Sequence, residues 1–180
     1  VYFGSFAGII RYHHGESKIL RRKNGFRLIF KVGNTIWAPI PGEGIYALNR
    51  QNFEFSFLKN SEALGDRRVS SIVPWRGGRY LLLASKAEPM VFDPRTEKLN
   101  VLKTSFDIRA FGASSCIQLN DGNYLMTSTS NGMAVMDSSG LLLGLVNISD
   151  GLPTNNIKSD FQGKDGSIWL STEKGIVCFD

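Results

Sequence analysis

The stretch "GKDGSIWLSTEKGIVCFD", residues 163–180, contains two apolar runs, each preceded by a short polar turn. The first turn is Asp165-Gly166 and the second is Lys174-Gly175. Glycine, asparagine and aspartate tolerate the positive φ angles that a tight hairpin needs, whereas β-branched residues do not. The stretch therefore predicts antiparallel strands joined by tight turns.

The Asp165-Gly166 turn recurs along the chain at a constant spacing. Matching turns stand at 33–34, 77–78 and 121–122, each 44 residues before the next, and apolar runs follow them: "TIWAPI", "RYLLLAS", "NYLMTST" and "SIWLST". A β-sandwich gives no reason for one turn to return at a fixed spacing. A period of about 40 to 50 residues is typical of the blades of a β-propeller.

Each repeat has room for four strands. The first precedes the turn ("FRLIFK" at 26–31, "VSSIVPW", "SSCIQL", "IKSDFQ"), the third follows a second turn ("IYALN", "MVFD", "MAVMD", "IVCFD"), and the fourth is "FEFSFL" (53–58), "KLNVL" or "LLLGLV". The second strand is apolar throughout, so we expect burial on both of its faces. Four residues at the ends of third strands suit the next turn: Asn49, Asp93, Asp137 and Asp180.

The fold class that follows is all-β: a β-propeller segment of about four to five four-stranded antiparallel blades. The opening "VYFGSFAGIIRYHHGESKIL" fits the repeat from its second strand onward, and the last repeat stops after its third strand. We therefore expect an arc of a larger ring of about seven blades. The expected blades cover residues 1–21 (partial), 25–60, 69–103, 113–147 and 155–180 (partial).

Composition is that of an ordinary folded protein, with 42% hydrophobic and 21% charged residues. The net charge of +5 arises from 21 basic and 16 acidic residues that are interspersed, so the chain carries no block of positive charge of the kind that binds nucleic acid. No apolar run approaches the roughly 18 residues that a membrane-spanning helix needs.

Residues 149–180 combine a Leu-Pro-x-Asn entry, the Asp165-Gly166 turn and an aromatic-apolar-x-Thr-x-x-Gly run. The positions of this pattern are Leu152, Pro153, Asn155, Ile157, Asp165, Gly166, Ile168, Trp169, Thr172, Gly175, Ile176 and Phe179. With these residues the stretch resembles the two-component regulator propeller repeat. The opening "YFGSFAGIIRY" is similar to the same repeat, whereas the three middle repeats keep the turns but have lost or shifted the tryptophan and threonine.

The resemblance implies the periplasmic sensor region of a bacterial hybrid two-component system, the ectodomain of an inner-membrane protein. In that family, propellers precede an immunoglobulin-like module, a membrane helix and a cytoplasmic histidine kinase, and many members from gut Bacteroides respond to oligosaccharides. The implied partners are an oligosaccharide, a second propeller and the immunoglobulin-like module of the same sensor, and a second copy in a homodimer.

Motifs for catalysis or cofactor binding are missing from the sequence: it contains no Gly-x-Ser-x-Gly elbow, no His-Glu-x-x-His and no phosphate-binding loop. We therefore expect no catalytic residue, no metal and no cofactor in this segment. His13 and His14 are adjacent, so on extended backbone they would point to opposite faces. Cys116 and Cys178 stand in apolar contexts and are expected to be buried, as are Trp37 and Trp169 between blades.

Binding is expected at the loops that join the fourth strand of one blade to the first strand of the next. These loops are "RRKNG" (21–25), "NSEALGDRR" (60–68), "TSFDIRAFG" (104–112) and "SDGLPTN" (149–155). Arginine holds carboxylate or sulfate oxygens through paired hydrogen bonds, so such a rim suits an acidic sugar. The candidate ligand-binding residues are Arg21, Arg22, Lys23, Arg67, Arg68, Arg109 and Phe106.

Three alternatives for the rim remain open. Its charges can be salt-bridged and solvated, since Glu62, Asp66 and Asp107 lie in the same loops. The propeller can serve only as a scaffold for protein interactions. It can also belong to a polysaccharide lyase or glycosidase, which requires acidic and basic groups to converge near the channel.

Overall fold

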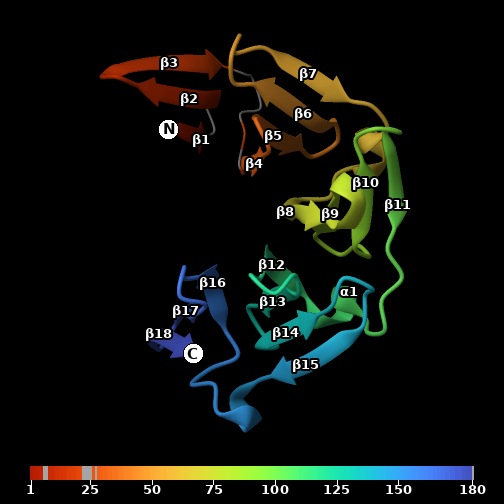
Figure 1. The fold of residues 1–180 in the computed structure, drawn as a ribbon, viewed down its shortest axis with the longest axis vertical. Coiled ribbons are helices and arrows are strands. Elements are labelled where there is room, and N and C mark those ends of the chain that lie inside the picture. Colours follow the sequence, from red (N-terminus) through yellow and green to blue (C-terminus); the bar gives the residue numbers. More distant parts are fainter. Residues whose placement is uncertain (6–7, 22–25, 27, 180) are drawn as a thin grey trace. The chain divides into compact units, whose positions relative to one another are not determined.

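The computed structural model describes residues 1–5, 8–21, 26 and 28–179. The chain divides into two compact units, Val1–Arg68 and Val69–Asp180. Within the described residues the chain forms five antiparallel sheets, three with four strands and two with three (Figure 1). The all-β class and the repeated antiparallel blades expected from the sequence are confirmed.

The first unit holds two sheets. One has the order β1-β2-β3, and the other has the order β4-β5-β6-β7. A 3-10 turn at Ser61–Leu64 follows the second sheet. The strands are β1 (Tyr2–Ser5), β2 (Gly8–His13), β3 (Glu16–Arg21), β4 (Phe30–Val32), β5 (Thr35–Ile40), β6 (Gly44–Asn49) and β7 (Phe55–Leu58).

The second unit holds three sheets in which consecutive strands pair. Its strands are β8 (Val69–Trp75), β9 (Arg79–Ala84), β10 (Met90–Asp93), β11 (Lys98–Val101), β12 (Ala113–Gln118), β13 (Tyr124–Ser128), β14 (Met133–Met136), β15 (Leu142–Val146), β16 (Ile157–Gln162), β17 (Ile168–Thr172) and β18 (Gly175–Phe179). A single-turn helix, α1 (Ile108–Phe111), precedes β12, and short 3-10 turns stand at Arg76–Gly78 and Ile148–Asp150. Among the described residues, no helix has the length and apolar character to span a bilayer.

The first strands of the three sheets in the second unit lie side by side. β12 contacts both β8 and β16, while the fourth strands β11 and β15 lie away from this line (Figure 1). Each of these first strands carries a β-bulge near its start, between Val69 and Ser71, Ala113 and Ser115, and Ile157 and Ser159. A bulge increases the local twist of its strand. Because β8, β12 and β16 have bulges at matching positions, the three sheets are twisted at the same place.

The sheet β12–β15 is buried on both faces. One face contributes Cys116, Tyr124, Met126, Ala134 and Met136 to a core shared with the sheet β8–β11. The other face contributes Ile117, Leu125, Met133 and Val135 to a core shared with the sheet β16–β18. All five residues of β13 are buried, as the apolar second strand predicts.

Tyr124 is the largest fully buried side chain of the molecule's described part. Its ring lies 4.7 Å from that of Trp75, and its hydroxyl donates to the Pro74 carbonyl at 2.9 Å. A buried tyrosine needs such a partner, because an unpaired hydroxyl in an apolar core costs about 1 to 3 kcal/mol. The pair therefore fixes the end of β8 against the next sheet.

Turn residues at the ends of third strands act as the sequence predicts. The side chains of Asn49, Asp93 and Asp137 each accept a backbone N–H two residues later, at 2.7 to 2.9 Å. The hydroxyl of Ser139 also donates to Asp137 and lowers the pKa of that carboxyl below its usual value. Asp180 lies outside the described residues.

The expected extent of one strand and the expected burial of one tryptophan are wrong. The first strand placed at 26–31 is only β4, Phe30–Val32, because Phe26 turns into the core of the first unit and its N–H donates to the Ser5 carbonyl at 2.9 Å. Trp37 is buried as expected, but Trp169 is 44% exposed. Trp169 is on the face of the sheet β16–β18 that points away from β12–β15, and its indole N–H donates to Ser167 Oγ at 2.9 Å.

Glycine precedes or opens most third strands, and the structure gives the reason. Gly132 has φ +76°, and a Cβ there would collide with the carbonyl oxygen of Val146, at the end of the fourth strand. Gly122, in the turn between β12 and β13, has a similar φ of +87°, but a Cβ there would meet no atom within 4 Å. The two glycines have similar positive φ angles and differ in crowding.

We predict that Gly132→Ala destabilises the protein more than Gly122→Ala does. Positive φ costs an alanine about 1 to 2 kcal/mol at either position, and the collision with backbone adds to this only at Gly132. Urea denaturation of both variants and of the wild-type chain measures the difference. Equal losses of unfolding free energy would contradict the role given to crowding.

Candidate functional site

The rim loops are residues 59–68, 102–112 and 147–156, which follow the fourth strands. They lie at the same end of their sheets as the turns between second and third strands. In the first unit Gly42 N–H donates to the Gly65 carbonyl at 2.9 Å, and in the second unit Leu102 N–H donates to the Pro89 carbonyl at 2.8 Å. For the third rim loop, Gly132 N–H donates to the Asn155 carbonyl at 3.1 Å. Each rim loop is thus hydrogen-bonded to the neighbouring turn.

The third rim loop is held by a carboxylate. Glu173, in the turn after β17, accepts from the Thr154 hydroxyl at 2.8 Å and from the Asn156 amide at 3.0 Å. These hydrogen bonds, that of Thr154 first, lower the pKa of Glu173. The carboxylate is therefore a structural part of the loop.

The predicted rim arginines are exposed and stand in different units. Arg21 ends β3, and Arg67 and Arg68 close the first unit, with Arg67 Nη1 donating to the Leu64 carbonyl at 3.1 Å. Arg109 is in α1 of the second unit, 3.8 Å from the Asp107 carboxylate, as the salt-bridged alternative anticipates. Arg22 and Lys23 lie outside the described residues. A shared rim for these side chains stays a prediction.

Phe106 lines a cavity of about 520 Å³ at the second rim loop, the rim cavity. Its ring also packs edge-on against Phe111 at 6.2 Å and contacts the core, so it is half-buried. The Thr104 hydroxyl donates to the Phe106 carbonyl at 2.7 Å and fixes the loop. The rim cavity is lined by Glu88, Pro89, Val101, Leu102, Lys103, Thr104, Ser105, Phe106, Asp107 and Ile108.

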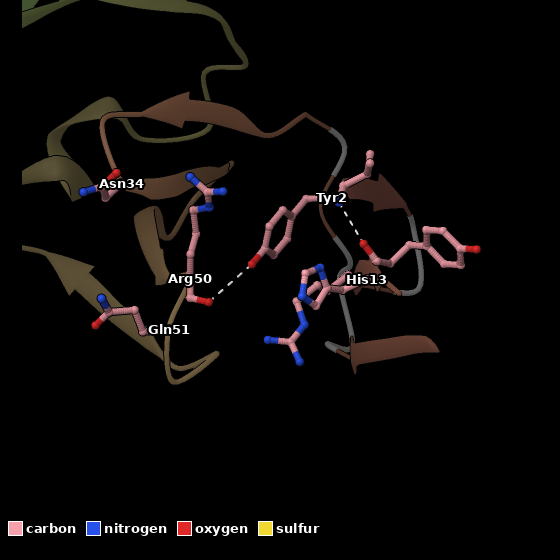
Figure 2. A pocket seen from close by; sticks show the side chains of 8 residues that line it. Tyr2, His13, Asn34, Arg50 and Gln51 are labelled. Carbon is pink, nitrogen blue, oxygen red and sulfur yellow. Dashed lines mark hydrogen bonds between the residues drawn. The ribbon is translucent and has the colours of Figure 1, made fainter. Parts of the chain in front are cut away.

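A second cavity, of about 410 Å³, lies in the first unit and is called here the basic pocket (Figure 2). It is formed where β1 and β2 meet the turns after β4 and β6. These turns are at the end of the sheet β4–β7 opposite the rim loop, because successive turns of an antiparallel sheet alternate between its ends. The lining residues are Val1, Tyr2, Arg11, Tyr12, His13, Asn34, Arg50 and Gln51.

Aromatic rings hold the two arginines of the basic pocket. The guanidinium of Arg50 lies 5.7 Å from the ring centre of Tyr2, whose hydroxyl donates to the Arg50 carbonyl at 3.4 Å (Figure 2). The guanidinium of Arg11 lies 5.1 Å from the ring centre of Phe53. Sequence reasoning missed this pocket because its residues come from four separate segments. The only signal was the aromatic and basic composition of those segments.

The two histidines differ from the expectation of opposite faces. Their ring centres are 4.0 Å apart with the rings edge to face, because His14 has φ +48° and leaves the extended path. The described residues include no group of three or more His, Cys, Asp or Glu side chains placed to hold a metal ion.

Cys116 and Cys178 also differ from each other. Cys116 is buried, as expected, and burial together with the nearby Asp160 carboxylate raises the pKa of its thiol. Asp160 accepts from the Thr127 hydroxyl at 2.6 Å in the same interface between sheets. Cys178 is exposed, against expectation, because it pairs across the strands with Trp169 on the outward face of the last sheet. No disulfide joins them.

Comparison with solved structures identifies the fold as a β-propeller. The extracellular domain of a hybrid two-component system from B. thetaiotaomicron matches 99% of this chain with a TM-score of 0.74 and 14% identity. The WD40 β-propeller domain of Doa1 matches 98% with a TM-score of 0.68 and 12% identity. A gluconolactonase from Xanthomonas campestris matches 98% with a TM-score of 0.69 and 13% identity.

The chain spans 27% of the sensor ectodomain, 58% of the WD40 chain and 67% of the gluconolactonase chain. No protein-family model matches the sequence, and no curated protein matches it either. At these identities the likeness establishes the fold. The sensor ectodomain among the similar structures agrees with the repeat resemblance found in the sequence.

We predict that alkylating reagents distinguish the two cysteines. At about pH 8 the exposed Cys178 thiol reacts with iodoacetamide, whereas Cys116 reacts only after unfolding, because burial removes access and its raised pKa keeps it protonated. Mass spectrometry of native and urea-denatured protein locates the modified residue. In Cys178→Ser the native protein should stay unmodified. Labelling of Cys116 in the folded chain would refute its buried position.

Proposed function

We propose that this chain is part of the periplasmic ligand-sensing domain of a hybrid two-component sensor histidine kinase and that it recognises an oligosaccharide. The observation that carries the proposal is the likeness, over 99% of the chain, to the extracellular domain of such a system. The repeat resemblance at residues 149–180 supports the same class from the sequence alone.

The rim loops are the proposed place of recognition. The rim cavity has the size of a small-ligand site and combines the half-buried ring of Phe106 with hydroxyl and charged groups. An aromatic ring offers a flat face to a sugar ring, while hydroxyl and carbonyl groups fix its orientation. Arg67, Arg68 and Arg109 are exposed and extend the polar surface of the rim loops in each unit.

Signalling in this proposal follows from differential binding. A ligand that contacts several blades, or a blade and a neighbouring module, binds one relative arrangement of domains more tightly than another. It therefore shifts the population toward that arrangement, and the kinase responds to the shift. The partners on which this depends are the other modules of the same sensor, and a second copy in a homodimer.

An enzymatic role is the second candidate, because the gluconolactonase shares the fold over 98% of this chain. Fold alone does not assign function, since propellers carry many activities. Incubating the protein with lactones and acidic polysaccharides and measuring ring opening or new reducing ends tests this role. Turnover that is lost in the heat-denatured sample would favour the enzyme over the sensor.

For the sensor we predict that exchanging Arg67, Arg68 and Arg109 together for glutamine weakens the binding of an acidic oligosaccharide by at least about tenfold, since charged hydrogen bonds contribute about 1.5 to 3 kcal/mol. A glycan array identifies the oligosaccharide, and isothermal titration calorimetry measures its affinity.

Arg76→Gln provides the matched control, because Arg76 is equally exposed but lies in the turn after β8, at the other end of its sheet. The prediction fails when the triple variant and this control bind every acidic ligand equally well.

A further inference from the structure

We propose that the basic pocket of the first unit binds the acidic group of a sugar, a carboxylate or sulfate carried on a pyranose ring. The choice of a sugar rests on the proposed sensing function, whereas the choice of an anion rests on the pocket itself. This site lies at the end of the β4–β7 sheet opposite the rim loop and shares no residue with the rim cavity.

Basic side chains gather in the lining of the basic pocket. Arg11, His13 and Arg50 line the basic pocket, and none of the described lining residues is an aspartate or glutamate. Within the described part of the chain, no carboxylate lies at ion-pair distance from either guanidinium. The two positive charges are therefore left without compensation in a concave site, which concentrates the positive potential there.

Placing cations side by side at this pocket costs stability. Arg11 stands directly opposite Lys18 on the neighbouring strand, and both cations lie over the ring of Phe53, at 5.1 Å and 5.3 Å. Like charges directly opposite each other destabilise a sheet. Phe53 itself has φ +61°, an unfavourable conformation for a bulky side chain. A bound anion would offset the repulsion between the two cations.

The guanidinium groups of the basic pocket are partly pre-organised. The rings of Tyr2 and Phe53 position Arg50 and Arg11 by cation–π contact, which reduces the side-chain freedom that binding must remove. A fixed guanidinium presents two parallel N–H groups that match the oxygens of a carboxylate or sulfate.

The remaining lining suits a sugar ring. Tyr2 and Tyr12 supply aromatic surface, and the amides of Asn34 and Gln51 can donate to and accept from hydroxyl groups. The cavity volume of about 410 Å³ is within the range of about 300 to 1,000 Å³ that small-ligand sites occupy. A monosaccharide or disaccharide unit with one acidic group meets these conditions.

The test is isothermal titration calorimetry of the full chain with D-galacturonic acid, galactose 6-sulfate and galactose. We expect the two acidic sugars to bind and galactose to bind at least about tenfold more weakly, because the charged contact is missing. Arg50→Gln should lower the affinity for the acidic sugars by at least about tenfold, and the control Arg76→Gln should leave it unchanged. The carboxylate and sulfate arms report which group the pocket prefers.

A second variant keeps the test independent of stability. Asn34→Asp suits the same turn but adds a negative charge to the pocket lining, so it should weaken the binding of both acidic sugars while thermal unfolding stays near the wild-type temperature. Equal affinity for galactose and its acidic analogues overturns the inference. So does unchanged binding in both variants, or no binding at about 10 mM sugar, which detects a Kd near 1 mM.

Failure of the pocket and failure of the sensor are distinguishable. Loss of acidic-sugar affinity in the rim triple variant but not in Arg50→Gln removes the basic pocket and leaves the sensor proposal standing. Loss in Arg50→Gln, combined with no transcriptional response of the full-length system to the same sugars, leaves the pocket standing and removes the sensor proposal.

Discussion

Burial of both faces of a sheet is the constraint on which this structure depends. The sheet β12–β15 packs apolar side chains against a neighbour on each side, through Tyr124 and Met126 on one face and Leu125 and Met133 on the other. Each fully buried side chain of this size stabilises the fold by about 1.5 to 3 kcal/mol. A sheet of four short strands can gather such burial only from its neighbours, so the sheets are stable as a stack.

Stacking has a consequence for where binding groups can stand. Most strand side chains are buried between sheets. Polar groups that can contact a ligand therefore lie mainly on the turns at the two ends of each sheet. The rim cavity follows this division, because it is built mostly from the loop after β11. The basic pocket follows it only in part: the turns after β4 and β6 supply Asn34, Arg50 and Gln51, whereas Arg11 and His13 stand on β2.

Much of the fold could be predicted from the sequence, because the turns between strands are determined by residues within each hairpin. The turn glycines and the Asx residues Asn49, Asp93 and Asp137 act within their own hairpins, and their spacing of about 44 residues located the sheets. The exposure of Trp169 and Cys178 was not predictable from one strand, because it depends on which face of the last sheet has a neighbour. The pattern of a strand shows which side chains share a face of the sheet. Whether another sheet covers that face depends on residues far away in the sequence.

The candidate sites divide in the same way. Phe106 was found from its loop, because the loop is continuous in sequence and its cavity is lined mostly by residues 101–108. The basic pocket was missed, because Tyr2, Arg11, Asn34 and Arg50 converge only after two sheets have packed. Cation–π contacts such as that of Arg50 with Tyr2 join residues 48 positions apart and leave no trace in spacing.

The crowding at Gly132 limits how the binding end of a sheet can be redesigned. A Cβ there would collide with the Val146 carbonyl, so the turn before β14 and the end of β15 touch through their backbones. Gly44 is crowded in the same way, by Ser61 Oγ and the backbone N of Glu62. Rim loops can therefore be exchanged to alter specificity only when the glycine at the adjoining corner is kept.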